Sequence, residues 1–219
     1  MDALERLMAI GGEAMSTRHT LINSYMIAHD VIHNDIPGAF VECGVYAGCQ
    51  CGAMALAVQE LHADRKIHCF DSFCGFPKAS IKDDVEFQIH LGIGSNSERT
   101  EITSDWGFDK QTVAKVQANF ERWGFPLDMF VFHEGSFHDT MPPWEEDVAL
   151  LRIDADLYES DMLCLQYLYP RLKVGGVCIM EDYGLIGGRR AYDEYFQGSV
   201  KPIAINPAWW VKVNTVHRT

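Results

Sequence analysis

The 219-residue sequence lacks the features that mark several large classes of protein. It has no run of lysine or arginine and a formal net charge of −13. This argues against nucleic acid or an anionic membrane as a partner, because phosphate contacts need clustered cations. Its apolar runs are shorter than the roughly 18 residues of a membrane-spanning helix. The first residues carry charge early and lack the apolar core of a secretion signal. We therefore expect a soluble cytoplasmic protein.

Motifs that bind zinc or a pyrophosphate group are missing as well. The seven cysteines form no CxxC pair and the nine histidines form no HExxH motif. We expect plain thiols in a reducing cell rather than a zinc site. No GxGxxG fingerprint follows a predicted strand, which disfavours a dinucleotide cofactor such as NAD.

What the sequence does contain is the pattern of a single α/β domain spanning 1–219. Its hydrophobic fraction of 47% is ordinary for a globular protein with a full core. Residues 1–35 are predicted to form two helices, the second over 17–33 with apolar residues at helical spacing. Beyond them strands and helices alternate, which predicts a doubly wound, mostly parallel sheet. The predicted strands are 39–43, 66–70, 129–133, 148–153 and 176–181, and the predicted helices are 48–62, 111–123, 158–172 and 188–197.

Two further segments have patterns of their own. Short strands at 200–205 and 209–214, divided by Asn206-Pro207, predict an antiparallel hairpin at the C-terminal end of the sheet. The segment 72–110 is rich in Gly, Ser, Asn, Thr and charged residues. Because a loop this long in a compact domain is usually functional, we expect a lid over the site. The apolar helices of residues 1–35 suggest self-association into a homo-oligomer.

The most informative feature is the acidic residues that follow two buried strands. Asp154 follows the run Val148–Ile153, and Glu181 and Asp182 follow the run Val177–Met180. The carboxyl ends of adjacent strands in an open α/β sheet form its ligand-binding edge, so these carboxylates are expected in one pocket. Like charges repel unless a positive charge lies between them, and a ligand set made only of oxygens suits Mg²⁺. The sequence therefore predicts a magnesium site.

The first strand and its turn predict a cofactor site. Glu42 lies at the end of the strand, and Gly44 and Gly48 permit a sharp turn and close approach of the next helix to a ligand. A carboxylate at Glu42 suits a cationic ligand with hydroxyl or ammonium donors, such as S-adenosylmethionine. Asp71 follows the next strand, where an acid accepts the ribose hydroxyls of a nucleotide, and Ser72 comes next. The two glycines alone also fit an ordinary strand-to-helix turn.

Three more residues near strand ends have a predicted role. Ser136 and Phe137 follow the strand at 129–133, where Ser136 would hydrogen-bond the adenine and Phe137 would pack against it. The same two residues also fit an ordinary turn with a packed aromatic ring. Asp156 is expected to be structural, as the N-cap of the helix that begins near Tyr158.

A set of motifs from Ile36 to the C-terminus resembles one known family. The motifs are Val41–Val45, Cys69–Pro77, Arg152–Ser160, Leu168–Pro170, Gly175-Gly176, Glu181–Gly184 and Arg190–Tyr195. Together they resemble the macrocin O-methyltransferases, which are S-adenosylmethionine- and Mg²⁺-dependent sugar O-methyltransferases of natural-product pathways.

The resemblance implies a Rossmann-like class I methyltransferase fold and a division of roles. Asp154, Glu181 and Asp182 would hold Mg²⁺, Asp154 would also act as general base, and Glu42 and Asp71 would bind the cofactor. The family usually has two Asp before the Tyr, whereas Glu181 here is one methylene longer. The segment 78–110 matches least, so the acceptor is defined only as a small molecule, a sugar or another vicinal diol.

Two alternatives compete with an O-methyltransferase. An NAD-linked oxidoreductase would need the missing fingerprint, and Glu42 lies where its pyrophosphate would bind. A non-catalytic binding module on the same fold would not need acids at several strand ends, because folding does not require buried like charges.

Overall fold

A computed structural model describes residues 2–11, 16–77, 80–83, 102–103 and 110–214. Its strands are β1 (Ala39–Cys43), β2 (Ile67–Asp71), β3 (Phe76–Pro77), β4 (Ile102–Thr103), β5 (Phe130–Glu134), β6 (Val148–Ile153), β7 (Leu172–Met180), β8 (Ala204–Ile205) and β9 (Ala208–Val211). Its α-helices are α1 (Ala3–Gly11), α2 (Arg18–His33), α3 (Cys49–Glu60), α5 (Val113–Arg122), α6 (Phe137–Thr140), α7 (Tyr158–Tyr167) and α8 (Ile186–Phe196). Short 3-10 turns are η1 (Leu127–Met129), η2 (Tyr169–Arg171) and η3 (Glu181–Gly184).

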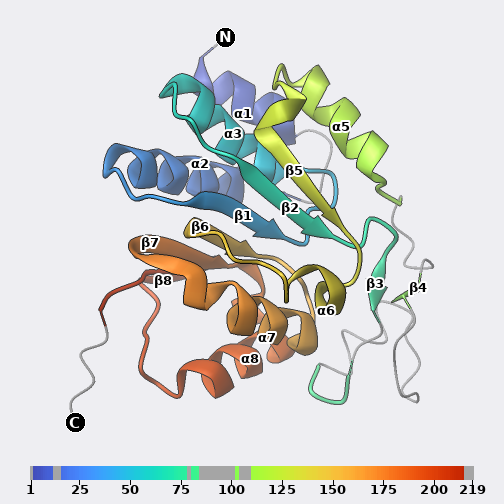
Figure 1. Ribbon diagram of the computed structural model, residues 1–219, viewed down its shortest axis with the longest axis vertical. Helices are drawn as coiled ribbons and strands as arrows, with labels where there is room; N and C mark the ends of the chain where they lie inside the picture. Colours follow the sequence, from blue (N-terminus) through green and yellow to red (C-terminus); the bar gives the residue numbers. More distant parts are fainter. Residues whose placement is uncertain (1, 12–15, 78–79, 84–101, 104–109, 215–219) are drawn as a thin grey trace.

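Seven strands of the described chain form one sheet. Their order is β5-β2-β1-β6-β7-β9-β8, and β3 pairs with β4 separately. The strands from β5 to β7 are parallel to their neighbours, whereas β9 is antiparallel to both β7 and β8. The predicted doubly wound, mostly parallel sheet with a C-terminal antiparallel hairpin is confirmed (Figure 1).

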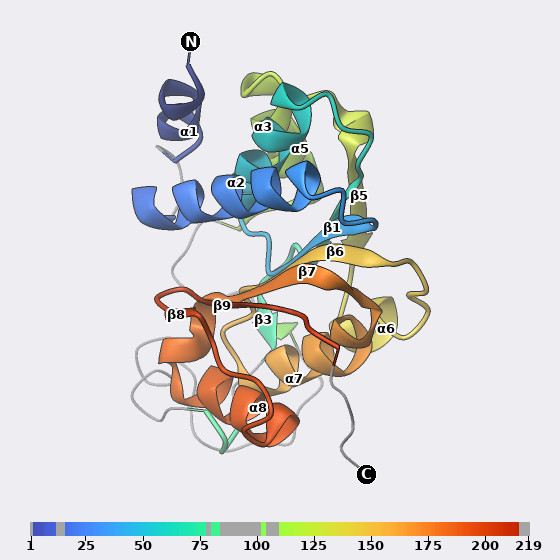
Figure 2. The same ribbon diagram turned by 90° about the vertical axis from the view of Figure 1, so that its left-hand side faces the viewer.

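Helices cover both faces of this sheet. The helices α1, α2, α3 and α5 lie on one face, and α6, α7 and α8 lie on the other (Figures 1 and 2). Phe40 and Phe120 belong to the apolar cluster on the first face, and Val41 and Leu151 belong to the cluster on the second. Successive side chains of a strand point to opposite faces, which is why Phe40 and Val41 are separated. Burial on both faces explains the nearly continuous apolar runs of β1 and β6.

Each central strand carries one charged residue on the α3 side of the sheet. Glu42 of β1 and Arg152 of β6 lie opposite each other in the register of the parallel pair. Both are 1% exposed. A buried charge is costly without a partner, and each of these two residues provides one for the other. The candidate site lies at this end of the sheet.

The sequence placed several boundaries wrongly. The predicted helix 158–172 is too long, because α7 ends at Tyr167 and a 3-10 turn containing Pro170 follows. Proline has no N–H group and its ring clashes with the preceding helical turn, so the helix cannot continue through it. As a result β7 begins at Leu172 rather than at 176. The hairpin strands β8 and β9 are shorter than predicted, and α6 is too short to show a helical period.

Most of the predicted lid at 72–110 lies outside the described residues. Within that segment the structure describes 72–77, which includes β3, the turn at 80–83, β4 and residue 110. In the described residues, no helix has both the length and the apolar character needed to cross a membrane.

Candidate active site

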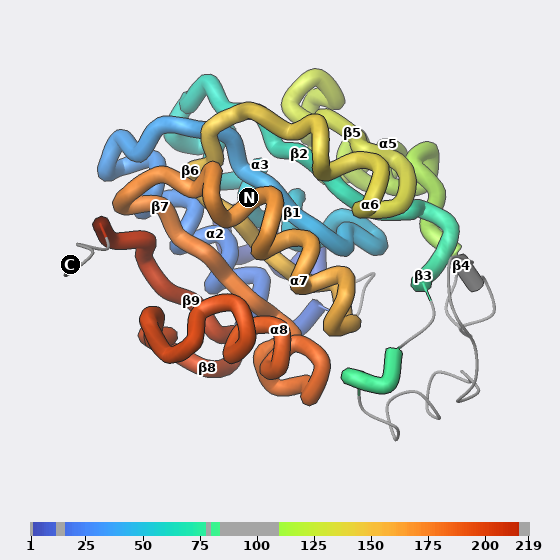
Figure 3. The backbone as a smooth tube through the Cα atoms, turned by 60° about the horizontal axis from the view of Figure 1, so that its bottom comes forward, coloured from blue at the N-terminus to red at the C-terminus, as the bar shows by residue number. Residues whose placement is uncertain are grey.

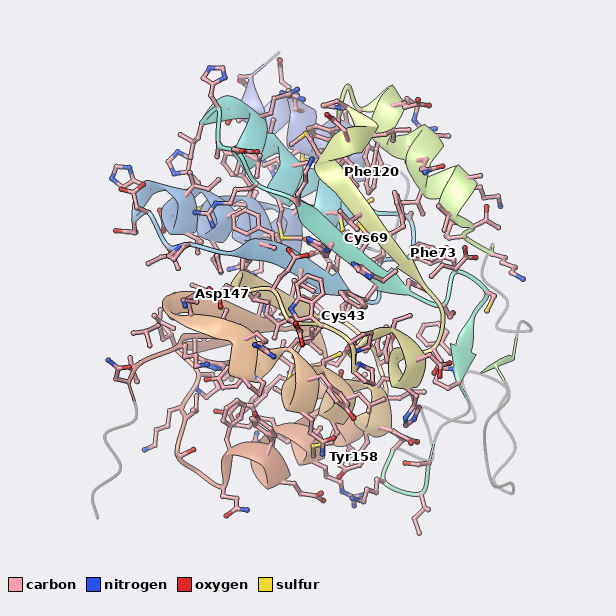
Figure 4. The ribbon with its side chains drawn as sticks, in the orientation of Figure 1. Cys43, Cys69, Phe73, Phe120, Asp147 and Tyr158 are labelled. Atoms are coloured by element: carbon pink, nitrogen blue, oxygen red, sulfur yellow. The ribbon has the colours of Figure 1, made fainter. Side chains whose placement is uncertain are left out.

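The carboxyl ends of β1, β2, β6 and β7 meet at one cavity of about 810 Å³. Figure 4 labels Phe73 at this edge, just after β2, and Asp147 at the opposite edge, just before β6. Nine residues predicted for the site line the cavity, namely Glu42, Gly44, Asp71, Ser72, Ser136, Phe137, Asp154, Glu181 and Asp182. The strand-end argument therefore predicted which of these residues lie together at one cavity.

Gly48 is the predicted residue that does not line this cavity. Its φ is +86°, and a Cβ at this position would lie 2.6 Å from Cε1 of Phe120. The space that glycine leaves is therefore filled by a side chain of α5 rather than left for a ligand. Gly48 therefore packs against α5, and its predicted contact with the cofactor stays a prediction.

Gly44 brings the turn after β1 against the end of β6. Its φ is +83°, and a Cβ there would collide with the carbonyl oxygen of Asp154. Only glycine combines this backbone conformation with so close an approach. The β1–α3 turn and the loop that carries Asp154 are therefore in direct contact.

The carboxylate of Asp71 holds two turns of the site. Its Oδ2 accepts hydrogen bonds from the N–H groups of Val45 (2.7 Å) and Tyr46 (3.1 Å), and its Oδ1 accepts one from Phe73 (2.8 Å). Tyr46 and Phe73 have φ values of +46° and +50°, a conformation that is costly for residues other than glycine. Asp71 therefore stabilises two strained turns, a role that the sequence did not reveal.

Ser72, predicted at the cofactor, and Ser136 and Phe137, predicted beside the adenine, have local structural roles as well. The Ser72 hydroxyl donates to the carbonyl of Gly75. Ser136 is the N-cap of α6 and accepts a hydrogen bond from the His138 N–H at 3.3 Å. Phe137 packs against the apolar cluster on the α7 side of the sheet. The turn with a packed aromatic ring is therefore present, at the edge of the cavity.

Arg152 lies among three of the acids. Its Nη2 is 3.0 Å from Asp154 Oδ2 and 3.0 Å from Glu181 Oε2, and its Nε is 3.4 Å from Glu42 Oε1. Burial alone would lower the pKa of Arg152, but Asp154, Glu181 and Glu42 raise it overall. The positive charge that the acids require is therefore supplied in part by β6 itself.

Glu42 has protein partners on both carboxylate oxygens. Besides the contact of Oε1 with Arg152, Oε2 accepts a hydrogen bond from Cys51 Sγ at 2.7 Å. Burial raises the pKa of Glu42 to about 8, against the lowering effects of Arg152 and Cys51. Glu42 thus connects α3 to the charged cluster, and its contact with a cofactor would compete with these partners.

The three predicted metal ligands each retain one carboxylate oxygen that accepts no hydrogen bond from the described residues. Arg152 donates to Asp154 Oδ2 and Glu181 Oε2, and the Asp156 N–H donates to Asp182 Oδ2 at 2.8 Å. Asp154 Oδ1, Glu181 Oε1 and Asp182 Oδ1 have no donor among the described residues. In the same part of the chain, no three His, Cys, Asp or Glu side chains are already arranged to hold a metal ion. The donor chemistry nevertheless fits Mg²⁺, through the oxygens that Arg152 and Asp156 leave available.

A second group of acids has no cation beside it in the described chain. It consists of Asp156, Asp161 and Asp182, and both carboxylate oxygens of fully buried Asp161 lack a hydrogen-bond partner. Burial and the neighbouring carboxylates raise the pKa of all three, that of Asp156 to about 8. This excess of negative charge favours protonation or a bound cation.

Sequence reasoning overlooked Arg152 and Asp83. A signal for Arg152 was present, because a charge inside the apolar run of β6 must have buried partners. No local signal identifies Asp83, whose Oδ1 accepts a hydrogen bond from the N–H of Tyr158, 75 residues later, at 2.7 Å. The prediction that Asp156 caps α7 is wrong, because α7 has no side-chain cap from the residues before it and Asp83 occupies that position.

Comparison with known proteins identifies close relatives of this chain. Residues 9–205 match the macrocin O-methyltransferase (TylF) family. The mycinamicin III 3''-O-methyltransferase of Micromonospora griseorubida is 33% identical over 204 residues, which cover 88% of this chain and 76% of the relative. The 8-demethyl-8-(2,3-dimethoxy-α-L-rhamnosyl)-tetracenomycin-C 4'-O-methyltransferase of Streptomyces olivaceus is 33% identical over 206 residues, which cover 89% of this chain and 73% of the relative.

A solved structure shares the same architecture. The O-methyltransferase NovP matches with a TM-score of 0.74 and 30% identity, covering 88% of this chain and 79% of NovP. The fold is that of class I methyltransferases. Sequence and fold agree that the chain belongs to the macrocin O-methyltransferase family and is an S-adenosylmethionine-dependent O-methyltransferase.

Proposed function

We propose that this enzyme methylates a hydroxyl of a sugar carried by a natural product, recognises a vicinal diol, and requires Mg²⁺. The relatives described above are named for methylation of mycinamicin III and of a rhamnosyl tetracenomycin. The second name specifies a rhamnosyl group, which supports a glycoside acceptor. The cavity of about 810 Å³ falls in the size range of small-molecule sites.

The proposal depends on the carboxylate oxygens at the edge of the cavity that have no donor in the part of the chain that the structure describes. Asp154, Glu181 and Asp182 would hold the ion through Oδ1, Oε1 and Oδ1. When bound, Mg²⁺ would lower the pKa of the acceptor hydroxyl and orient it. Asp156 and buried Asp161 lie near these ligands, and a cation at this position would favour the ionised forms of their carboxyl groups, whose pKa values are otherwise raised.

Asp154 is the residue we assign to proton transfer. Burial raises its pKa to about 6, against the lowering effect of Arg152, so the carboxylate is ionised at neutral pH and can accept a proton. Arg152 binds Oδ2 and thereby fixes the orientation of the side chain. The remaining oxygen, Oδ1, has two acceptor sites, so one can face the ion while the other faces the acceptor hydroxyl.

We place the cofactor at the ends of β1, β2 and β5. Gly44, Ser72, Ser136 and Phe137 line this side of the cavity. Asp71 Oδ1 accepts one hydrogen bond, from Phe73. Because a carboxylate oxygen has two acceptor sites, Oδ1 retains one for a ribose hydroxyl. The assignment of Glu42 to the cofactor requires a ligand donor that replaces one of its present partners.

Titration calorimetry and a transferase assay test this function against the two alternatives. We expect S-adenosylmethionine to bind and NAD not to bind, and we expect methyl transfer to mycinamicin III to stop with EDTA and to resume with Mg²⁺. Binding of NAD in preference to S-adenosylmethionine would favour the oxidoreductase. Cofactor binding without transfer to glycosides or simple diols would favour the binding module, and full activity in metal-free protein would exclude the metal.

A further inference from the structure

The loop that carries Asp154 has a strained backbone. Asp156 has a φ of +63°, in the left-handed region that is unfavourable for residues other than glycine. Such a conformation persists only where the surrounding structure imposes it. Two carboxylates bind the loop amides, because Asp182 Oδ2 accepts from the Asp156 N–H at 2.8 Å and Asp83 Oδ1 accepts from the Tyr158 N–H at 2.7 Å.

Asp83 is fixed in place for this contact. It is 5% exposed, and its Oδ2 accepts hydrogen bonds from the Ser80 N–H (2.7 Å) and the Ser80 hydroxyl (2.9 Å). A Cβ at Gly187, in the first turn of α8, would collide with Asp83 Oδ1. The carboxylate therefore lies in a space shaped by the starts of two helices, and it satisfies an N–H group that α7 itself leaves without a side-chain cap.

The rest of the turn at 80–83 is also attached to these helices. Lys82 Nζ lies 2.6 Å from the Tyr158 hydroxyl and 3.1 Å from Glu194 Oε2, and Arg190 donates to the Lys82 carbonyl at 2.8 Å. Figure 3 shows this turn beside the first part of α8. Lys82 and Glu194 are about half exposed, so their ion pair contributes little. Asp83 is the buried contact of the turn.

We propose that Asp83 is a positioning residue for Asp154. By binding the first amide of α7 it holds the strained loop that presents Asp154 to the cavity and that is bound by Asp182. Without it the backbone at Asp156 can relax, and Asp154 then moves relative to the acceptor. The inference rests on the proposed function, in which Asp154 accepts the proton.

Hydrogen exchange and kinetics on Asp83→Ala test this role. We expect amides of residues 154–160 to exchange about fivefold faster, as for the loss of a helix cap, with exchange in β1 unchanged. The kcat for methylation of mycinamicin III should fall by about 10²-fold, the typical result of a small misplacement, while affinity for S-adenosylhomocysteine stays constant. Asp83→Asn keeps an acceptor oxygen and should restore both the exchange rate of residues 154–160 and the kcat.

Two further variants separate positioning from general stability. Gly187→Ala should reproduce the effects of Asp83→Ala without removing the carboxylate. Asp147→Ala, which removes a carboxylate paired with Lys173 at the opposite edge of the sheet (Figure 4), should change neither exchange nor kcat.

Unchanged exchange of 154–160 in Asp83→Ala would overturn the proposal, as would a loss of kcat accompanied by an equal loss of S-adenosylhomocysteine affinity. If Asp83→Ala does not fold, normal exchange in Gly187→Ala would overturn it. A wild-type protein without transferase activity would count against the proposed function, and the exchange comparison would still decide the role of Asp83.

Discussion

Arg152 Nη2 and Glu181 Oε2 lie 3.0 Å apart where the arginine side chain is 1% exposed. A permanent cation is thus part of the sheet, and no chelator can remove it. Glu181, with its longer side chain, contacts this cation through one oxygen and leaves the other at the cavity. The acids of the site are therefore held by β6 before any ligand binds, which lowers the cost of organising them.

Removal of this guanidinium should destabilise the fold. Arg152→Met leaves the carboxylates of Asp154, Glu181 and buried Glu42 without their common partner. Loss of one member of a buried ion pair, here that of Arg152 with Glu42, costs about 3–5 kcal/mol. Arg152→Lys keeps the charge and should cost less. Urea unfolding measures both free energies. A methionine variant as stable as the wild type would show that these contacts contribute nothing to stability.

Cofactor affinity should depend on Asp71. Asp71→Ala leaves the N–H groups of Val45, Tyr46 and Phe73 without their acceptor, so two turns beside the proposed cofactor site relax. We expect a loss of about 1–3 kcal/mol in the affinity for S-adenosylmethionine, as for an unsatisfied buried hydrogen bond. Calorimetry measures it, with Asp193→Ala, which removes an exposed ion pair with Arg189, as control. Equal affinity of both variants would refute the assignment of this strand end to the cofactor.

The fold and the convergence of the acids were predictable because both follow from local patterns. The spacing of apolar residues identifies alternating strands and helices, which predicts the parallel sheet, and parallel strands place Asp154, Glu181 and Asp182 at one edge. The contacts of Arg152 with Glu42 and Glu181 depend on the order of the strands in the sheet, which this spacing does not specify. The cap from Asp83 depends on a turn 75 residues before Tyr158. Partners that are far apart in sequence leave no local signal, and for that reason these contacts appeared only in the structure.

His68 should make the fold sensitive to acid. Burial, followed by the effects of His133 and Lys66, lowers its pKa from 6.5 to about 4, and its Nδ1 lies 2.9 Å from His133 Nε2. Between these pH values the unfolded chain binds a proton that the folded chain does not. The stabilising contribution is therefore present above pH 6.5 and is lost as the pH falls through about 4.

The variant His68→Gln isolates this contribution. The raised pKa of Glu42, about 8, acts in the opposite direction in both proteins, since the folded chain then holds a proton that the unfolded chain has released. Because the effect of Glu42 is the same in both proteins, it cancels in the difference between their melting temperatures. We expect the wild type to lose more stability than the variant between neutral pH and about pH 4. Parallel melting curves across this range would show that His68 does not titrate as described.

Asp154 and Glu181 should respond differently to added metal. Asp154→Asn retains an oxygen donor but loses its basicity, and loss of a general base costs about 10²–10⁴-fold in rate. Glu181→Gln should act mainly through a weaker affinity for Mg²⁺, because Arg152 still holds Asp154 in place, so excess Mg²⁺ should partly restore its activity. Titration of each variant with Mg²⁺ at saturating cofactor distinguishes the two roles. If saturating Mg²⁺ returns Asp154→Asn to nearly the wild-type kcat, Asp154 is only a ligand, and the proton must go to another group at the cavity.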